Sequence, residues 1–172
     1  MKEAMTIYKL IILYTLNRTE TPLTFGLISD FITEHEYTNY FNIQTAFSEL
    51  LDAGLITCCK TTYNTSYYMI TGAGQETLEL FYTDLSLEIR LEIDAYLEDN
   101  LASIINRTSV TSDYTHRENG DYIARCSILE NNELVFELTL AVPSEKDAVK
   151  LCDNWQDASS ELYSAAIRTL LE

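Results

Sequence analysis

The sequence predicts an α+β protein, and three observations lead to that prediction. Apolar residues recur at helical spacing through Phe47, Leu50 and Leu51 and stop at Gly54, a residue suited to the left-handed backbone that ends many helices. Two runs rich in tyrosine and β-branched residues, which favour strands, follow directly. From Thr108 the apolar period changes to two residues, which is typical of further strands. Helices and strands in separate blocks indicate an α+β fold.

The block from Thr24 to Gly74 is predicted to form a winged helix-turn-helix, within a first domain over 1–74. Its last helix leads into a hairpin over 55–71, and the turn composition at 63–66 favours that hairpin, which is the expected wing. The segment from Tyr67 to Gly74 resembles the tyrosine, aliphatic, threonine and spaced-glycine pattern that closes the wing in PadR-like and MarR-like regulators.

A helical connector is expected over 75–106, beginning at Gln75. Two apolar stripes at spacings of three and four residues indicate two helices with a break near 84–87. Ser86 is placed to cap the second helix, and Glu88 to interact with the positive end of its dipole. The stripes comprise Leu78, Phe81, Tyr82 and Leu85, and then Ile89, Ile93, Tyr96, Leu97, Leu101 and Ile104.

The remaining block, 107–172, is expected to form a three-stranded antiparallel sheet covered by a long helix. Asn119-Gly120 is a strong signal for a hairpin turn, and 130–132 provides a second turn. Pro143 ends the third strand, and Ser144 is the expected cap of a helix that reaches Leu171. The expected apolar faces are Tyr122, Ala124, Cys126 and Ile128; Leu134, Phe136, Leu138, Leu140 and Val142; and, on the helix, Ala148, Cys152, Trp155, Ser159, Leu162, Ala166 and Leu170.

Several short segments, distributed over nearly the whole chain, together carry a second resemblance. They are Asn39-Tyr40-Phe41-Asn42, Leu55-Ile56, Tyr68 to Gly74, Ile89-Arg90, Ile93-Asp94-Ala95-Tyr96, Tyr122 to Cys126, Val142-Pro143 and Cys152-Asp153-Asn154-Trp155. With them the chain resembles a bacterial family that carries a domain-of-unknown-function label and an N-terminal winged helix. Ser86 stands where such relatives are expected to have proline. The resemblance implies a transcriptional regulator by analogy of fold.

Charge argues against strong binding to nucleic acid. The chain has 11 basic and 27 acidic residues and a formal net charge of −16, and the segment from Thr19 to Cys59 contains no Lys or Arg. That segment includes the helix that would enter the major groove. Such a surface repels nucleic acid and anionic membranes, and it also favours solubility. The basic residues of the first domain available for phosphate contacts are Lys2, Lys9, Arg18 and Lys60.

The predicted recognition helix nevertheless carries residue types that read bases. Asn and Gln can pair with adenine, and Thr or Ser can contact bases or phosphates. At a salt slope of about −0.9 for each phosphate contact, two or three contacts per subunit predict weak binding, which a dimer strengthens. The predicted DNA contacts are Asn39, Tyr40, Asn42, Gln44, Thr45 and Ser48 on the helix, with Lys60, Tyr63 and Asn64 on the wing. The alternative is that Asn39, Asn42 and Gln44 are solvated residues at a helix start, and Glu49 and Asp52 oppose DNA on the same helix.

The competing hypothesis is a protein-interaction or dimerisation module built on the winged helix. Its supports are the missing positive charge and a group of aromatic residues, because tyrosine provides a large contact area with one polar group. Some of these rings would instead pack the wing against the first helix. The whole group of aromatic residues comprises Tyr37, Tyr40, Phe41, Tyr63, Tyr67 and Tyr68. A homodimer is expected, in which the stripes of 75–106 either serve two subunits or pack on the C-terminal sheet.

The sequence favours a non-enzymatic protein without cofactor or metal. His116 lies among charged residues near a strand end, and His35, between Glu34 and Glu36, lacks a third ligand. The cysteines have neither metal-ligand spacing nor a CxxC motif, which fits a reducing cytoplasm. The apolar stretch from Met5 to Leu16 is too short to span a bilayer, and an amphipathic first helix is expected there. The cysteines are Cys58, Cys59, Cys126 and Cys152.

Overall fold

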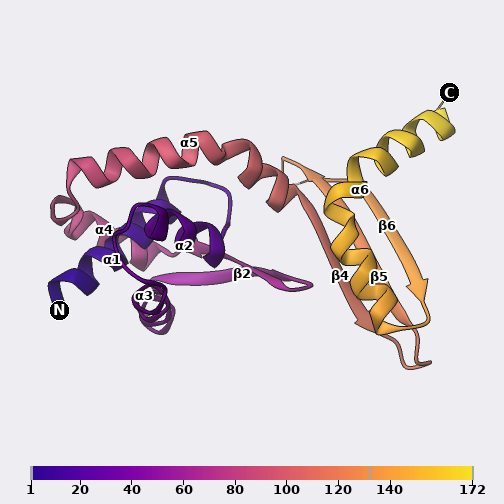
Figure 1. Cartoon of the computed structure of the whole chain (residues 1–172), viewed down its shortest axis with the longest axis horizontal. Coiled ribbons are helices and arrows are strands. Elements are labelled where there is room, and N and C mark those ends of the chain that lie inside the picture. Colours follow the sequence, from indigo (N-terminus) through magenta and orange to yellow (C-terminus); the bar gives the residue numbers. More distant parts are fainter. Residues whose placement is uncertain (1, 132, 172) are drawn as a thin grey trace. The chain divides into compact units, whose positions relative to one another are not determined.

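A computed structural model describes residues 2–131 and 133–171, with all of their side chains except those of Lys2, Glu3, Arg107 and Thr108. The protein is mixed α+β, with two three-stranded antiparallel sheets and a long C-terminal helix (Figure 1). The α+β class predicted from sequence is therefore confirmed. The chain divides into two compact units, Met1–Thr61 with Thr65–Ile104, and Ile105–Glu172 with Thr62–Asn64.

The first unit contains most of the helices and the smaller sheet. β1 pairs antiparallel with β3, and the strand order of this sheet is β1-β3-β2. Helix α5 begins in this unit and runs along its other helices (Figure 1). In chain order the elements are α1 (Lys2–Asn17), β1 (Leu23–Thr24), α2 (Phe25–Glu34), α3 (Tyr40–Asp52), β2 (Ile56–Thr62), β3 (Thr65–Ile70), α4 (Gly72–Leu80), the 3-10 turn η1 (Tyr82–Asp84) and α5 (Leu87–Ser109).

One apolar core joins the helices of the first unit. It contains the buried part of α1 from Leu10 to Leu16, the fully buried Phe31 of α2, and Ile93 and Leu97 of α5. The α5 stripe therefore packs within the first unit, which is neither of the two placements considered from sequence. Leu101, predicted to belong to that stripe, is exposed.

The junction after α3 depends on local hydrogen bonds that the sequence only partly predicts. Gly54 has φ of 68°, the left-handed conformation expected at the helix end. Thr71 Oγ1 donates to the Gly54 carbonyl at 2.7 Å and accepts from the Gly74 N–H at 3.1 Å. Because Thr71 caps the helix, α4 begins at Gly72 rather than at the predicted Gln75.

Helix α4 is also shorter than its apolar stripe predicts. It ends at Leu80, and η1 follows, so Phe81 and Tyr82 leave the helical period and are exposed. The predicted break before α5 is confirmed. Ser86 Oγ accepts from the Ile89 N–H at 3.3 Å, which is the expected cap of α5.

The second unit is the predicted sheet with its long helix. β4 (Val110–His116), β5 (Tyr122–Glu130) and β6 (Glu133–Val142) form an antiparallel sheet in that order, and α6 (Glu145–Leu171) crosses one face (Figure 1). Cys126 lies opposite Leu138 and Ile128 opposite Phe136, so the predicted faces of β5 and β6 coincide over this part of the sheet. A β-bulge at Ile128/Leu129 then pairs Leu134 with Leu129, so Leu134 does not lie on the predicted face. Gly120 has φ of 91° in the predicted first hairpin turn, whereas the turn predicted at 130–132 includes residue 132, outside the described residues.

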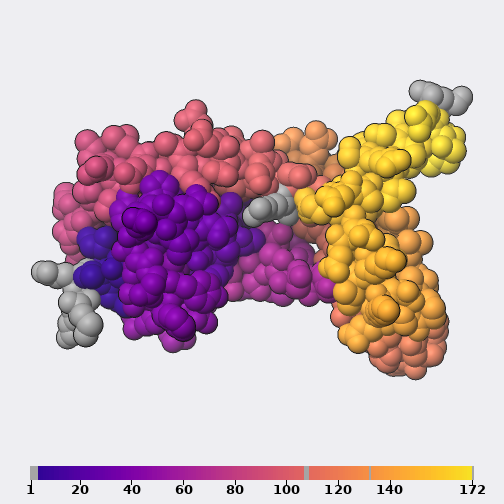
Figure 2. Space-filling model, viewed as in Figure 1, coloured from indigo at the N-terminus to yellow at the C-terminus, as the bar shows by residue number. Residues whose placement is uncertain are grey.

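The stripe predicted for α6 is buried along only half of the helix. On α6, the side chains of Ala148, Cys152, Trp155 and Ser159 are buried, whereas those of Leu162 and Leu170 are exposed. A helix of 27 residues is about 40 Å long, whereas a strand of 10 residues is about 33 Å long. The helix is only about 7 Å longer than the strand. Its burial nevertheless ends at Ser159, and its C-terminal half extends beyond the sheet, as the yellow end shows (Figure 2).

Candidate interaction surface

The predicted recognition helix, α3, begins with a network of hydrogen bonds within its own first turns. Asn39 is the N-cap, and its Oδ1 accepts from the Asn42 N–H at 3.1 Å. Asn42 Nδ2 donates to Thr38 Oγ1 at 2.8 Å, and Thr45 Oγ1 donates to the Phe41 carbonyl at 2.9 Å. These three polar side chains therefore stabilise the helix start, as the alternative explanation of Asn39 and Asn42 expects.

The outer face of α3 combines exposed aromatic and polar side chains. Phe41 is 77% exposed and Tyr40 is 51% exposed. Gln44 and Ser48 are exposed one and two turns further along the helix. Tyr40 packs edge-on against Phe25, with ring centroids 5.6 Å apart. The Phe25 contact therefore fixes the position of the Tyr40 ring.

Most of the other aromatic residues expected at this surface are partly or fully covered. Tyr67 is buried, and Tyr37, Tyr63 and Tyr68 are half-buried. Tyr37 donates a hydrogen bond to a Glu92 carboxylate oxygen, and burial, followed by this carboxylate, raises the pKa of Tyr37. Packing within the protein therefore accounts for these four rings.

Two of the basic residues of the first unit, Lys9 and Arg18, are in ion pairs, and the Arg90 guanidinium lies over the Tyr82 ring at 4.2 Å. Lys9 Nζ lies 2.6 Å from Glu49 Oε2 of α3, and Arg18 Nε lies 2.7 Å from Asp94 Oδ1. Lys60, on β2, is half-buried beside the Tyr67 ring, and burial lowers its pKa. Lys60 is the one basic residue of α3 and the β2–β3 hairpin, where Tyr63 and Asn64 form the turn. The side chain of Lys2 lies outside the described residues.

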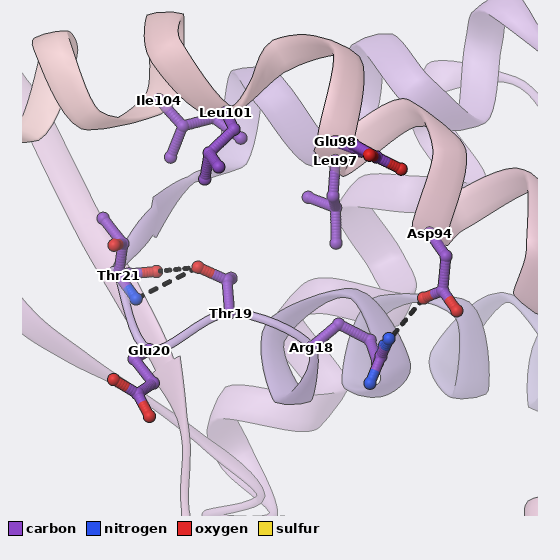
Figure 3. Close-up of a pocket in the computed structure, with 9 residues that line it drawn as sticks. All are labelled: Arg18, Thr19, Glu20, Thr21, Asp94, Leu97, Glu98, Leu101 and Ile104. Atoms are coloured by element: carbon purple, nitrogen blue, oxygen red, sulfur yellow. Dashed lines mark hydrogen bonds and ion pairs between the residues drawn. The ribbon is translucent and has the colours of Figure 1, made fainter.

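A cavity of about 440 Å³ lies in the first unit between α5 and the segment Arg18–Thr21 (Figure 3). Leu97, Leu101 and Ile104 point from α5 toward that segment, and the Arg18–Asp94 ion pair lies at one end. The cavity is not predictable from the sequence, because its walls come from residues far apart in the chain. Its volume lies in the range of small-molecule sites.

The comparisons with known proteins give a family. The model of the domain of unknown function DUF4364 matches residues 8–170. The chain belongs to this family. Neither a curated protein nor a solved structure matches it. The uncharacterised family predicted from the resemblance is thus confirmed.

The cysteines of this DUF4364 protein fall into two groups. Cys58 and Cys59 are exposed on β2, whereas Cys126 and Cys152 are buried in the second unit. Burial, with a smaller effect of Cys152, raises the pKa of the Cys126 thiol to about 11. Among the described residues, no three His, Cys, Asp or Glu side chains form a group that would hold a metal ion, and no helix is long and apolar enough to span a bilayer.

These two groups should differ in reactivity. We expect Cys58 of the native DUF4364 protein to react with a thiol reagent near neutral pH, and Cys126 and Cys152 to react only after unfolding. Cys59 should react more slowly than Cys58, because burial raises the pKa of Cys59 and its Sγ donates to the Tyr67 carbonyl. Burial blocks access, and the raised pKa of Cys126 leaves little of the reactive thiolate. Mass spectrometry of the protein labelled with and without denaturant measures this directly. Modification of Cys126 in the native protein would contradict the buried placement.

Proposed function

We propose that the first unit of this protein is a winged helix that serves as a protein-docking module, with the N-terminal half of α3 as its contact surface. The order of α1, β1, α2, α3, β2 and β3, with a sheet in the order β1-β3-β2, supports the winged helix. In that fold the helix at the position of α3 is the one that recognises a partner. A shared fold leaves the partner open, so the partner is inferred from the surface of α3.

The observation that carries the proposal is the 77% exposed Phe41 on a face without positive charge. Exposed aromatic residues are enriched among the residues that dominate binding energy at protein interfaces. The surrounding charge is negative, since Asp52 lies on the same helix and Glu36 precedes it, while Glu49 is paired with Lys9. The matching partner is a protein surface with an apolar pocket for Phe41 and basic residues around that pocket.

The small number of basic residues available for phosphate contacts supports a protein rather than DNA as the leading partner. With Lys9 and Arg18 in ion pairs, Lys60 is left to contact phosphate from the hairpin. One contact gives a salt slope of about −0.9, and a symmetric dimer about −1.8. Tight DNA-binding proteins make roughly six to ten such contacts.

A second candidate function is direct, sequence-specific DNA binding by a dimeric transcriptional regulator. The observation that favours it is the row of exposed Gln44, Thr45 and Ser48 on α3, residue types that can contact base edges. In this arrangement α3 enters the major groove, and Tyr63 and Asn64 at the turn of the hairpin approach the backbone. The resemblance of the hairpin sequence to PadR-like and MarR-like regulators supports the same candidate.

Two parallel selections on the full chain test the proposal, one with a phage-displayed random-peptide library and one with random duplex DNA. We expect enriched peptides that combine Arg or Lys with an aromatic or leucine residue. Phe41→Ala should weaken their binding at least tenfold, because truncating such an aromatic anchor costs about 2 kcal/mol or more. Leu80→Ala is the matched control, since Leu80 is 80% exposed on α4, and its effect should be negligible.

The DNA selection provides the contradicting result. An enriched duplex whose binding is lost in Gln44→Ala and Thr45→Ala, but retained in Phe41→Ala, would establish DNA recognition and overturn the docking proposal. Peptides that bind Phe41→Ala as well as they bind the unmodified chain would overturn it too.

A further inference from the structure

Two apolar surfaces of the second unit are uncovered. The first is the C-terminal half of α6, where the stripe that covers the sheet continues as Leu162, Ala166 and Leu170. Leu170 is 80% exposed. This half of the helix stands clear of the sheet (Figure 2), so the second unit itself offers nothing to cover it.

The second surface is a groove between α6 and β6. It has a volume of about 230 Å³ and is lined by Leu138 of β6 and by Leu151, Trp155 and Leu162 of α6. The helix packs mainly on β4 and β5, which leaves this side of β6 open. Leu140, which shares the face of Leu138, is exposed beside the groove.

We propose that the protein is a symmetric homodimer in which the C-terminal half of α6 of each copy packs into the α6–β6 groove of the other. Among the described residues of the second unit, no helix covers the groove, and no sheet covers the apolar end of α6. The apolar end of α6 in one copy can therefore cover the groove of the other copy. Because both belong to one chain, a two-fold axis satisfies both pairs at once, which is the property of an isologous interface. The occupant of the groove is therefore a second copy of this chain.

Charge supports the same occupant. The N-terminal half of α6 has four acidic residues, Glu145, Asp147, Asp153 and Asp157, and two basic ones, Lys146 and Lys150, so it remains net negative, and Asp147 and Lys150 both line the groove. The last turn of α6 carries a basic residue, Arg168. Antiparallel packing of two α6 helices brings each Arg168 toward the partner's acidic half, and opposite charges across an interface favour that pairing over others.

Helix α5 is a weaker candidate for the dimer interface. Leu87, Leu91 and Leu101 are exposed on one of its faces, but Glu98 interrupts that face at helical spacing, and Asp94 on the same face is held by Arg18 of its own copy. Across a two-fold axis Glu98 would approach its counterpart in the partner, and like charges in contact destabilise an interface. The α6 stripe has no charged residue between Leu162 and Leu170 at the same spacing.

Sedimentation velocity and light scattering on the full chain test the dimer. The unmodified protein should sediment as a dimer, and Leu170→Asp should convert it to a folded monomer, because Leu170 is exposed within its own copy. Leu91→Asp places the same charge on α5 and should leave the dimer intact. A monomeric unmodified protein, or a dimer that only Leu91→Asp dissociates, would overturn the proposal.

A disulfide test locates the partner's helix. With Cys58 and Cys59 replaced by Ser, Leu140→Cys and Leu170→Cys should form an intermolecular disulfide under mild oxidation. Leu140 lies near the start of α6, and Leu170 lies 25 residues beyond Glu145, the first residue of α6, about 38 Å along the helix. A bond within one copy is therefore excluded, since it requires Cα atoms within about 7 Å.

Each outcome of the disulfide test is decisive. The proposed packing is supported if the variant with both cysteines forms a cross-linked dimer and the two single-cysteine variants form it much more slowly. A dimer that Leu170→Asp dissociates but that gives no Leu140–Leu170 cross-link places the end of α6 elsewhere on the partner and overturns the packing on β6.

Discussion

Replacing Trp155 by alanine is expected to unfold the second unit or to remove most of its stability. Trp155 is 2% exposed, its ring stacks on Phe136 with centroids 6.3 Å apart, and its Nε1–H donates to the Ser127 carbonyl at 3.3 Å. Removing a buried Trp side chain costs about 3–5 kcal/mol. A small domain has a total of about 5–15 kcal/mol, so this loss is a large part of the whole.

The size of the core makes this unit particularly sensitive. Its buried cluster consists of Val110, Cys126 and Trp155, with half-buried neighbours such as Phe136 and Leu138. Trp155 is by far the largest of the three, so no other buried side chain can compensate for its loss by moving into the cavity. Backbone circular dichroism in a urea titration measures the change, since the alanine variant has no tryptophan.

Two further substitutions control for the Trp155 result. Trp155→Phe keeps a buried ring and should lose clearly less stability than Trp155→Ala. Val135→Ala, at an exposed position of β6, should cost less than about 1 kcal/mol. If Trp155→Ala unfolded at the same urea concentration as the unmodified protein, the placement of Trp155 in the core would be wrong.

Gly74→Ala should destabilise the first unit by about 1–3 kcal/mol or more, the range of overpacked cores. A Cβ atom at Gly74 would lie 2.1 Å from the Leu55 carbonyl oxygen and 2.7 Å from Ile70 Cγ1. The Leu55 oxygen cannot simply move away, because it accepts the Thr71 N–H at 3.0 Å. Thermal unfolding followed by circular dichroism measures the change.

Gly72→Ala is the matched control for Gly74→Ala. Gly72 is in the same helix turn, and a Cβ there meets no atom within 4 Å. The substitution should be neutral or stabilising by a few tenths of a kcal/mol, because alanine reduces the entropy of the unfolded chain. Equal stability of the two alanine variants would show that α4 does not approach Leu55 as closely as the structure has it.

The parts of the fold that the sequence predicts correctly depend on neighbouring residues. Gly54 ends α3, Ser86 caps α5, and Gly120 forms the first turn of the C-terminal sheet, each for a reason found within a few residues. The register of β5 and β6 from Tyr122 to Ile128 follows from alternation, because a slip by one residue would exchange the two faces, whereas the shift between Ile128 and Leu129 is not visible in the sequence. The predicted start of α4 at Gln75 is wrong, because the glycines at 72 and 74 suggest a break, whereas Thr71 caps the helix by accepting from the Gly74 N–H.

The candidate surface is less predictable because exposure depends on distant parts of the chain. Phe41 and Tyr67 are both aromatic residues in polar surroundings, yet Phe41 is exposed and Tyr67 is buried. Lys9 is neutralised by Glu49, 40 positions further along the chain. The sequence shows the absence of Lys and Arg from Thr19 to Cys59, but not that the nearest lysine is already in an ion pair.

The burial of Trp155 also makes the two units spectroscopically distinct. It is the single tryptophan of the chain, whereas the 12 tyrosines occur on both sides of residue 104. Tryptophan emission therefore reports the loss of the second unit alone, while helix content, measured by circular dichroism, reports both. A difference between the two unfolding curves would measure how independently the units fold, without cutting the chain.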